Sequence, residues 1–180
     1  MNKENIMAII VLPLLCLIMG GLLALSESVT RPVIEVASAA RAETARKEII
    51  PQADNFELLG MEALLSKPDF PKTITAVYKT TNNTGYVFMI TTSGYGGEIK
   101  LICGISTDGN IIKTATLSQT ETKGLGSPVF DEPHAGQYWG RDKKGIEDIA
   151  AISGATISST AYKNGMRDAF VAFEIVKGSL

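Results

Sequence analysis

The stretch Ser153-Gly154-Ala155-Thr156-Ile157-Ser158-Ser159-Thr160 carries five hydroxyl side chains in eight residues and no charge. Apolar side chains recur after it at three- and four-residue steps, which predicts an amphipathic helix over residues 159–177. Hydroxyl groups at a helix start act as N-caps, and the free N–H groups there, at the positive end of the helix dipole, suit a phosphate. The stretch therefore favours one of two structures, a plain N-cap with spare hydroxyls or a phosphate site.

Four β-strands are predicted upstream of this helix. The alternating or apolar runs lie at residues 73–79, 86–92, 98–106 and 111–119. Turn signals at Asn82-Asn83-Thr84-Gly85 and Asp108-Gly109 separate neighbouring runs, so the strands should pair antiparallel. A short helix is expected at 61–65. The pattern predicts an α+β fold, in which an N-terminal single transmembrane helix precedes an antiparallel sheet packed with helices.

The chain begins with a charge-free apolar run of twenty residues, 6–25. At 1.5 Å per residue, a helix of this length spans about 30 Å, the thickness of a hydrocarbon core. A cleaved signal peptide is the alternative, with Ala24 and Ser26 at the candidate cleavage site, but its apolar core would be unusually long. We expect a transmembrane helix with a short tail over 1–27, a helical spacer over 28–69 and a globular domain over 70–180.

Composition excludes several functions. The formal net charge of −2 gives no electrostatic footprint for nucleic acid. Two cysteines and one histidine cannot supply a self-contained Fe–S cluster or zinc site, and no Gly-x-Gly-x-x-Gly opens a βαβ unit for a nicotinamide cofactor. We expect no metal site and no disulfide between Cys16 and Cys103. His134 is expected to be exposed and to have no catalytic role. The aromatic side chains near this histidine are expected to be core or loop anchors: Phe130, Tyr138 and Trp139.

Two further segments are rich in glycine and polar side chains, Gly94-Tyr95-Gly96-Gly97 and Ser118-Gln119-Thr120-Glu121-Thr122-Lys123-Gly124-Leu125-Gly126. Each is typical of a plain turn or loop, although closely spaced glycines also let a backbone approach a flat ligand. In order with Ser153-Gly154-Ala155-Thr156 and the apolar start, they resemble the FMN-binding domain family. The chain is most similar to the G subunit of Rnf-type ion-translocating electron-transport complexes, and the C subunit of the sodium-translocating NADH:quinone reductase is a close relative.

The resemblance implies that Thr156 carries FMN through a phosphoester bond. It places the other cofactor-binding residues in the same three segments: Ser153, Gly154, Ala155, Glu121, Thr122, Gly124, Leu125, Gly96 and Gly97. A threonine hydroxyl is a poor nucleophile unless it is activated, and no histidine lies near Thr156 in the sequence. Attachment is therefore expected to need a separate flavin transferase, which in the family uses FAD and a divalent metal.

Two positions depart from the family pattern. The motif usually has an aspartate three residues before its first Ser or Thr, which is Ser153 here, and that position is Ala150. Glu147 and Asp148 lie slightly upstream as candidate substitutes for recognition by the transferase. The second segment often contains proline where this chain has Lys123, which would loosen a turn and adds a cation near the ligand.

The resemblance thus implies a single-pass protein of the cell (inner) membrane, in contact with membrane lipid, whose extracytoplasmic FMN-binding domain covers residues 70–180. It would relay electrons between the other membrane subunits of an Rnf-type complex, and no catalytic residue is expected in this chain. Three alternatives stay open. One is the C subunit of the sodium-translocating NADH:quinone reductase, one is a membrane-tethered module that binds FMN or another phosphate ligand reversibly, and one is a structural extracytoplasmic protein.

Overall fold

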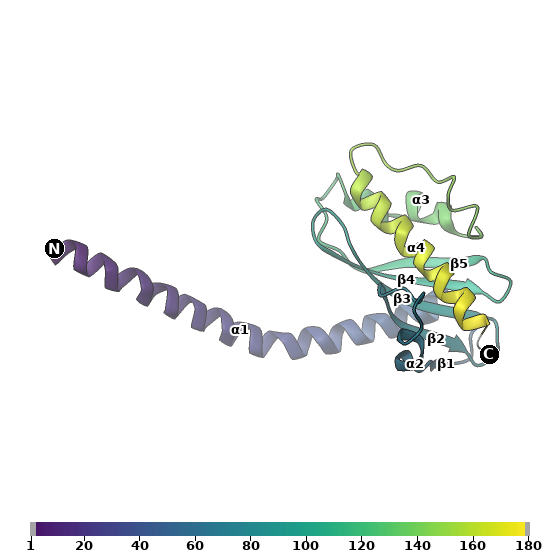
Figure 1. Ribbon diagram of the computed structural model, residues 1–180, viewed down its shortest axis with the longest axis horizontal. Helices are drawn as coiled ribbons and strands as arrows, with labels where there is room; N and C mark the ends of the chain where they lie inside the picture. Colours follow the sequence, from purple (N-terminus) through teal and green to yellow (C-terminus); the bar gives the residue numbers. More distant parts are fainter. Residues whose placement is uncertain (1–2, 179–180) are drawn as a thin grey trace. The chain divides into compact units, whose positions relative to one another are not determined.

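The computed structural model describes residues 3–178, and its contacts divide the chain into two units, Met1–Arg41 and Ala42–Leu180. The long helix α1, Lys3–Ile49, begins in the first unit and ends in the second. Figure 1 labels the elements in chain order.

The first unit is the apolar part of α1. Its large hydrophobic side chains from Val11 to Leu25 are exposed, and the segment Val11–Ile49 is long and apolar enough to cross a membrane. The side chains of residues 6–10, which belong to the predicted apolar run, lie outside the described part. Residues 28–49 continue the same helix, with Pro32 inside it. A proline is tolerated there where neighbouring groups satisfy the freed backbone carbonyl.

The second unit is built on a five-stranded antiparallel sheet. The strands are β1 Phe56–Leu58, β2 Ile74–Thr80, β3 Gly85–Ser93, β4 Glu98–Ser106 and β5 Ile111–Ser118, in the spatial order β1-β2-β3-β4-β5. The four predicted strands are confirmed, and so is the α+β class. The strand β1 was not predicted because three residues are too short to show an alternating pattern.

Helix α4, Thr156–Lys177, covers one face of this sheet (Figure 1). Its buried Tyr162, Met166 and Phe170 join a core with sheet residues such as Phe88 and Leu101. A Cβ at Gly165 would lie 3.3 Å from Ile90 and 3.4 Å from Leu101, so this glycine lets the helix approach the strands closely. The helix begins three residues earlier than predicted, at Thr156.

The last two turns of α1 cover the opposite face of the sheet. Ile49 and Ile50 are buried against Val87 and Ile102 in a second apolar cluster. A Cβ at Gly104 of β4 would overlap the Ile49 side chain, so only glycine leaves room for the helix end at this point. The sheet is therefore a central layer between two helical segments, as a sheet with two apolar faces requires.

Short helices fill the connection between β5 and α4: η1 Ser127–Phe130, α3 Glu132–Ala135 and η2 Gly136–Tyr138. The predicted short helix is also present, as α2 Met61–Leu65. The prediction of an exposed His134 is wrong, since α3 turns this side chain inward to 5% exposure, with its ring 6.0 Å from the ring of Tyr138. Burial, and then the charge of Lys163, lower the pKa of His134.

The aromatic anchors were predicted correctly. Tyr138 is buried, Phe130 packs with its ring centroid 5.8 Å from that of Tyr162, and the Trp139 Nε1–H donates to Thr114 Oγ1 at 3.0 Å. Both cysteines are free thiols, and Cys103 lies fully buried in β4. Burial raises the pKa of the Cys103 thiol well above its ordinary value.

Replacing Gly104 should test the packing of the α1 end on the sheet. We expect Gly104→Ala to destabilise the second unit by about 1–3 kcal/mol, because the added methyl group forces Ile49 out of its place. Urea unfolding of the full-length protein in detergent, followed by the fluorescence of Trp139, measures the change. Gly60→Ala is the matched control, since its Cβ would have no atom within 4 Å. Equal midpoints for the two variants would contradict this packing.

Candidate functional site

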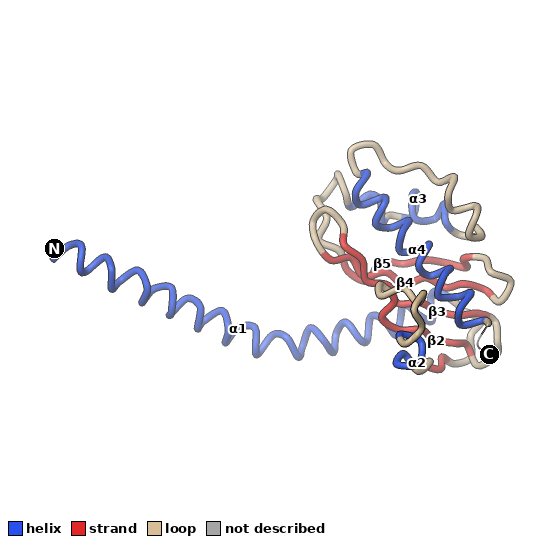
Figure 2. The backbone as a smooth tube through the Cα atoms, viewed as in Figure 1, coloured by secondary structure: helices blue, strands red, loops and turns tan. Residues whose placement is uncertain are grey.

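The three glycine- and hydroxyl-rich segments meet at one cleft. The turn between β3 and β4, the loop after β5 and the first turn of α4 surround a volume of about 390 Å³. In Figure 2 the two loops are tan connections near the start of α4, whose first turn is blue. The side chains and backbone that line the cleft belong to Tyr95, Glu121, Thr122, Leu125, Gly126, Gly154, Thr156, Ile157 and Ser158.

Thr156 is the first residue of α4 and lines the cleft. The side chain is exposed, and among the described residues it makes no hydrogen bond. The plain hydroxyl N-cap, one of the two structures that the sequence left open, does not form, because the N-cap residue is Ala155 and no side chain caps the helix. The first N–H groups of a helix have no acceptor within it, so this helix start presents free donors beside a free hydroxyl.

Glu121 forms the polar floor of the cleft. Its side chain is 8% exposed, its Oε1 accepts the Gly96 N–H at 3.0 Å, and its Oε2 accepts the Ser158 hydroxyl at 2.7 Å. The carboxylate thus joins the β3–β4 turn to the first turn of α4. Since the loop after β5 carries Glu121 itself, one side chain holds all three segments of the cleft together.

The contact between Glu121 and the β3–β4 turn explains why this turn contains glycines. A Cβ at Gly94 would overlap Glu121 Oε1, and one at Gly96 would overlap the backbone oxygen of Thr120. The Thr120 hydroxyl also donates to the Gly96 carbonyl at 3.0 Å. These glycines therefore let two loops approach each other, and the suggested approach to a flat ligand stays a prediction.

The cleft unites five of the ten predicted site residues: Gly154, Thr156, Glu121, Thr122 and Leu125. The other five lie in the same loops but do not line it: Ser153, Ala155, Gly124, Gly96 and Gly97. The lining also includes Tyr95, Gly126, Ile157 and Ser158, which were not predicted as site residues. Three of these four lie directly beside a predicted site residue, so the spacing of the motifs could have indicated them. Lys123 is exposed and is not in the lining.

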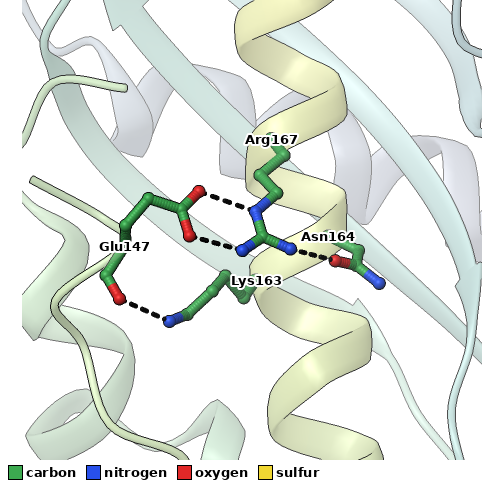
Figure 3. Close-up of polar contacts among 4 residues, drawn as sticks. All are labelled: Glu147, Lys163, Asn164 and Arg167. Carbon is green, nitrogen blue, oxygen red and sulfur yellow. Dashed lines mark hydrogen bonds and ion pairs between the residues drawn. The ribbon is translucent and has the colours of Figure 1, made fainter. Parts of the chain in front are cut away.

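The loop that leads into Thr156 is fixed to α4 at Glu147, as Figure 3 shows, and again at Ile152. Arg167 donates from Nε to Glu147 Oε1 at 2.7 Å and from its second terminal nitrogen to Glu147 Oε2, while Lys163 Nζ donates to the Glu147 carbonyl at 2.9 Å. Further along, the Ile152 N–H donates to Ser159 Oγ at 3.1 Å. The Arg167 contact occupies the Glu147 carboxylate, which leaves exposed Asp148 as the more accessible of the two acids upstream of Ala150.

Comparison with known proteins decides the family. Residues 94–171 match the FMN-binding domain model. The chain is 33% identical to the G subunit of the Na⁺-translocating ferredoxin:NAD⁺ oxidoreductase complex of Acetobacterium woodii, over 80% of this chain and 79% of that protein. It belongs to the G-subunit family of ion-translocating oxidoreductase complexes. Within this family it is also 31% identical to the G subunit of the ion-translocating complex of Methanosarcina acetivorans, over 93% of this chain and 94% of that protein.

A third member of the G-subunit family comes from a complex that is named for a different ion. The protein of Clostridium ljungdahlii, 29% identical over 88% of this chain and 85% of its own length, belongs to a complex named as proton-translocating. Relatives of similar identity are thus named for sodium and for protons. Family membership therefore does not determine the coupling ion.

The cleft fits an FMN group. Its volume lies within the roughly 300–1,000 Å³ of cofactor sites. Tyr95, Leu125 and Ile157 line it although 72%, 51% and 56% of their surfaces are exposed, which provides apolar contacts for a ring. The free N–H groups at the start of α4 suit a phosphate. The residues present thus match both parts of the cofactor.

The Glu147–Arg167 pair predicts a pH-dependent contribution to stability. Hydrogen bonds from Arg167 lower the pKa of Glu147, so the pair stabilises the fold above the ordinary glutamate pKa and is lost as pH falls through the lowered one. Arg167→Met should lower the melting temperature slightly at neutral pH, and the difference should shrink below about pH 4. Thermal unfolding against pH measures this, with Arg141→Met as the control for loss of a surface arginine. A difference that stays constant down to acidic pH would contradict it.

Proposed function

We propose that this chain is a membrane-anchored flavoprotein subunit of an ion-translocating electron-transport complex, with FMN esterified through its phosphate to Thr156. The observation that carries the proposal is the position of Thr156, a free exposed hydroxyl at an uncapped helix start, on the wall of the cleft. Membership of the G-subunit family and the FMN-binding domain match support the cofactor and the complex.

The residues of the cleft would divide the work of holding the cofactor. The N–H groups of the first turn of α4 would face the phosphate, where the helix dipole favours a negative charge. Tyr95, Leu125 and Ile157 would contact the ring, and Glu121 would keep the loops in register through Gly96 and Ser158. The bound flavin supplies the electron-transfer chemistry, which no side chain of the described residues provides by itself.

The attachment would depend on a separate transferase. Forming the ester replaces the O–H bond of Thr156 by an O–P bond and releases AMP from FAD, while the hydroxyl proton passes to a base of the transferase. The chain has no evident base for this proton near Thr156 among its described residues. Both oxygens of Glu121 already accept hydrogen bonds, and His134 is buried beside the ring of Tyr138. A threonine without an activating base reacts too slowly to modify itself.

The partners follow from the same proposal. The apolar part of α1 would anchor the chain in the membrane lipid, with the second unit on the extracytoplasmic face. Residues 11–25 contain no ionisable acid or base apart from the Cys16 thiol, so an ion path would be formed by other subunits. Electrons would enter and leave the cleft through carriers of those subunits, since no group of three potential metal ligands occurs within residues 3–178 as described.

Thr156→Ala tests the attachment. The full-length protein is co-expressed with a flavin transferase and separated on a denaturing gel, where a covalent flavin fluoresces. We expect a fluorescent band from the wild type and a complete loss in Thr156→Ala, because the oxygen that forms the ester is removed. Mass spectrometry of the peptide around Thr156 should show the addition of one FMN less one water.

Thr160→Ala is the matched control, since this exposed threonine lies one helical turn further along α4 and should keep the band. Thr156→Ser should keep it as well, because its hydroxyl remains at the same helix position. An unmodified peptide from wild-type protein matured in its own cell would overturn the proposal. Reversible binding of FMN by that protein would support the tethered module that was the alternative.

A further inference from the structure

We propose that Glu121 lowers the reduction potential of the flavin in this cleft, because its carboxylate lies in the wall of the site where the flavin would take up an electron. The inference rests on the proposed function, since it requires a flavin in this cleft. Glu121 would act as a positioning and tuning residue, through its charge and its two hydrogen bonds. It would not take part in any bond that is made or broken.

The charge of Glu121 has no cationic partner. Among the described residues no ion pair involves this carboxylate, and its contacts are to the neutral Gly96 N–H and the neutral Ser158 hydroxyl. Its side chain is nevertheless 8% exposed and lines the cleft. A carboxylate without a cationic partner, screened by little water, therefore lines the cleft where the flavin would bind.

The backbone around Glu121 is arranged to hold the carboxylate in this place. A Cβ at Gly94 would overlap Oε1, and a Cβ at Gly126 would lie 2.7 Å from Oε2. Two glycines from two different loops thus leave the space that the carboxylate fills.

The sign of the effect follows from electrostatics. An electron delivered to a flavin ring adds one negative charge there until a proton from solvent follows. A fixed negative charge nearby opposes this step, so removing it should favour the reduced form. Unit charges roughly 10 Å apart at an effective dielectric constant of about 20 change such an equilibrium on the order of tenfold.

Glu121→Gln removes the charge and can keep both contacts. The amide oxygen can accept the Gly96 N–H, and the amide nitrogen can donate to the Ser158 oxygen, because a hydroxyl serves as either donor or acceptor. Ser158→Ala does the reverse. It keeps the charge but removes the hydroxyl that partly neutralises it, so the carboxylate should oppose reduction more strongly.

The experiment compares reductive titrations of full-length proteins that carry covalent flavin. At a fixed solution potential we expect the ratio of reduced to oxidised flavin to rise on the order of tenfold in Glu121→Gln and to fall in Ser158→Ala. Glu132→Gln, which removes an exposed carboxylate in α3, is the control for net charge and should leave the ratio unchanged.

The outcomes separate this inference from the proposed function. Absence of a covalent flavin band in the wild type would contradict the proposed function. A band with an unchanged or lower ratio in Glu121→Gln would overturn the role of Glu121 alone, as would a rise in Ser158→Ala, which would indicate loosening of the cleft. If Glu121→Gln takes up no flavin, Ser158→Ala decides, since only a fall in its ratio supports the inference.

Discussion

The arrangement of the cleft depends on one buried carboxylate that accepts from a backbone N–H on one side and a hydroxyl on the other. Glu121 connects the β3–β4 turn, the loop after β5 and the first turn of α4, which are separated by 25 and 37 residues along the chain. A buried carboxylate is costly to desolvate, and its two hydrogen bonds offset part of that cost. Losing either donor would leave a buried charge less satisfied, so the three segments are expected to move together.

The sheet and its main helix were predictable because their signals are local. Alternation in the runs from 73 to 119, the turn at Asp108-Gly109 and the helical spacing after Thr156 each reflect contacts between near neighbours in sequence. The burial of His134 was not predictable in this way, because a four-residue helix is too short to show which of its side chains face inward. The start of α4 was also misplaced, since hydroxyl side chains suggested a cap that the fold leaves to Ala155.

The candidate site was predictable in its segments but not in its contacts. The motifs indicated Thr156, Glu121 and Leu125, all of which line the cleft. They did not indicate that Glu121 bonds to Ser158, because that contact joins residues 37 apart and depends on how α4 packs on the sheet. The glycines at 94 and 96 were expected to let a flat ligand approach, which stays a prediction, whereas the contact found in the structure is with another loop of the same chain.

The full burial of Cys103 has a consequence for how the protein matures. A thiol with a raised pKa, fully buried in the core between β4 and α4, reacts poorly with oxidants and with other thiols. The second unit has no other cysteine, so its folding involves no disulfide formation or exchange. The same folded domain can therefore form in an oxidising or a reducing compartment, without help from disulfide-forming enzymes.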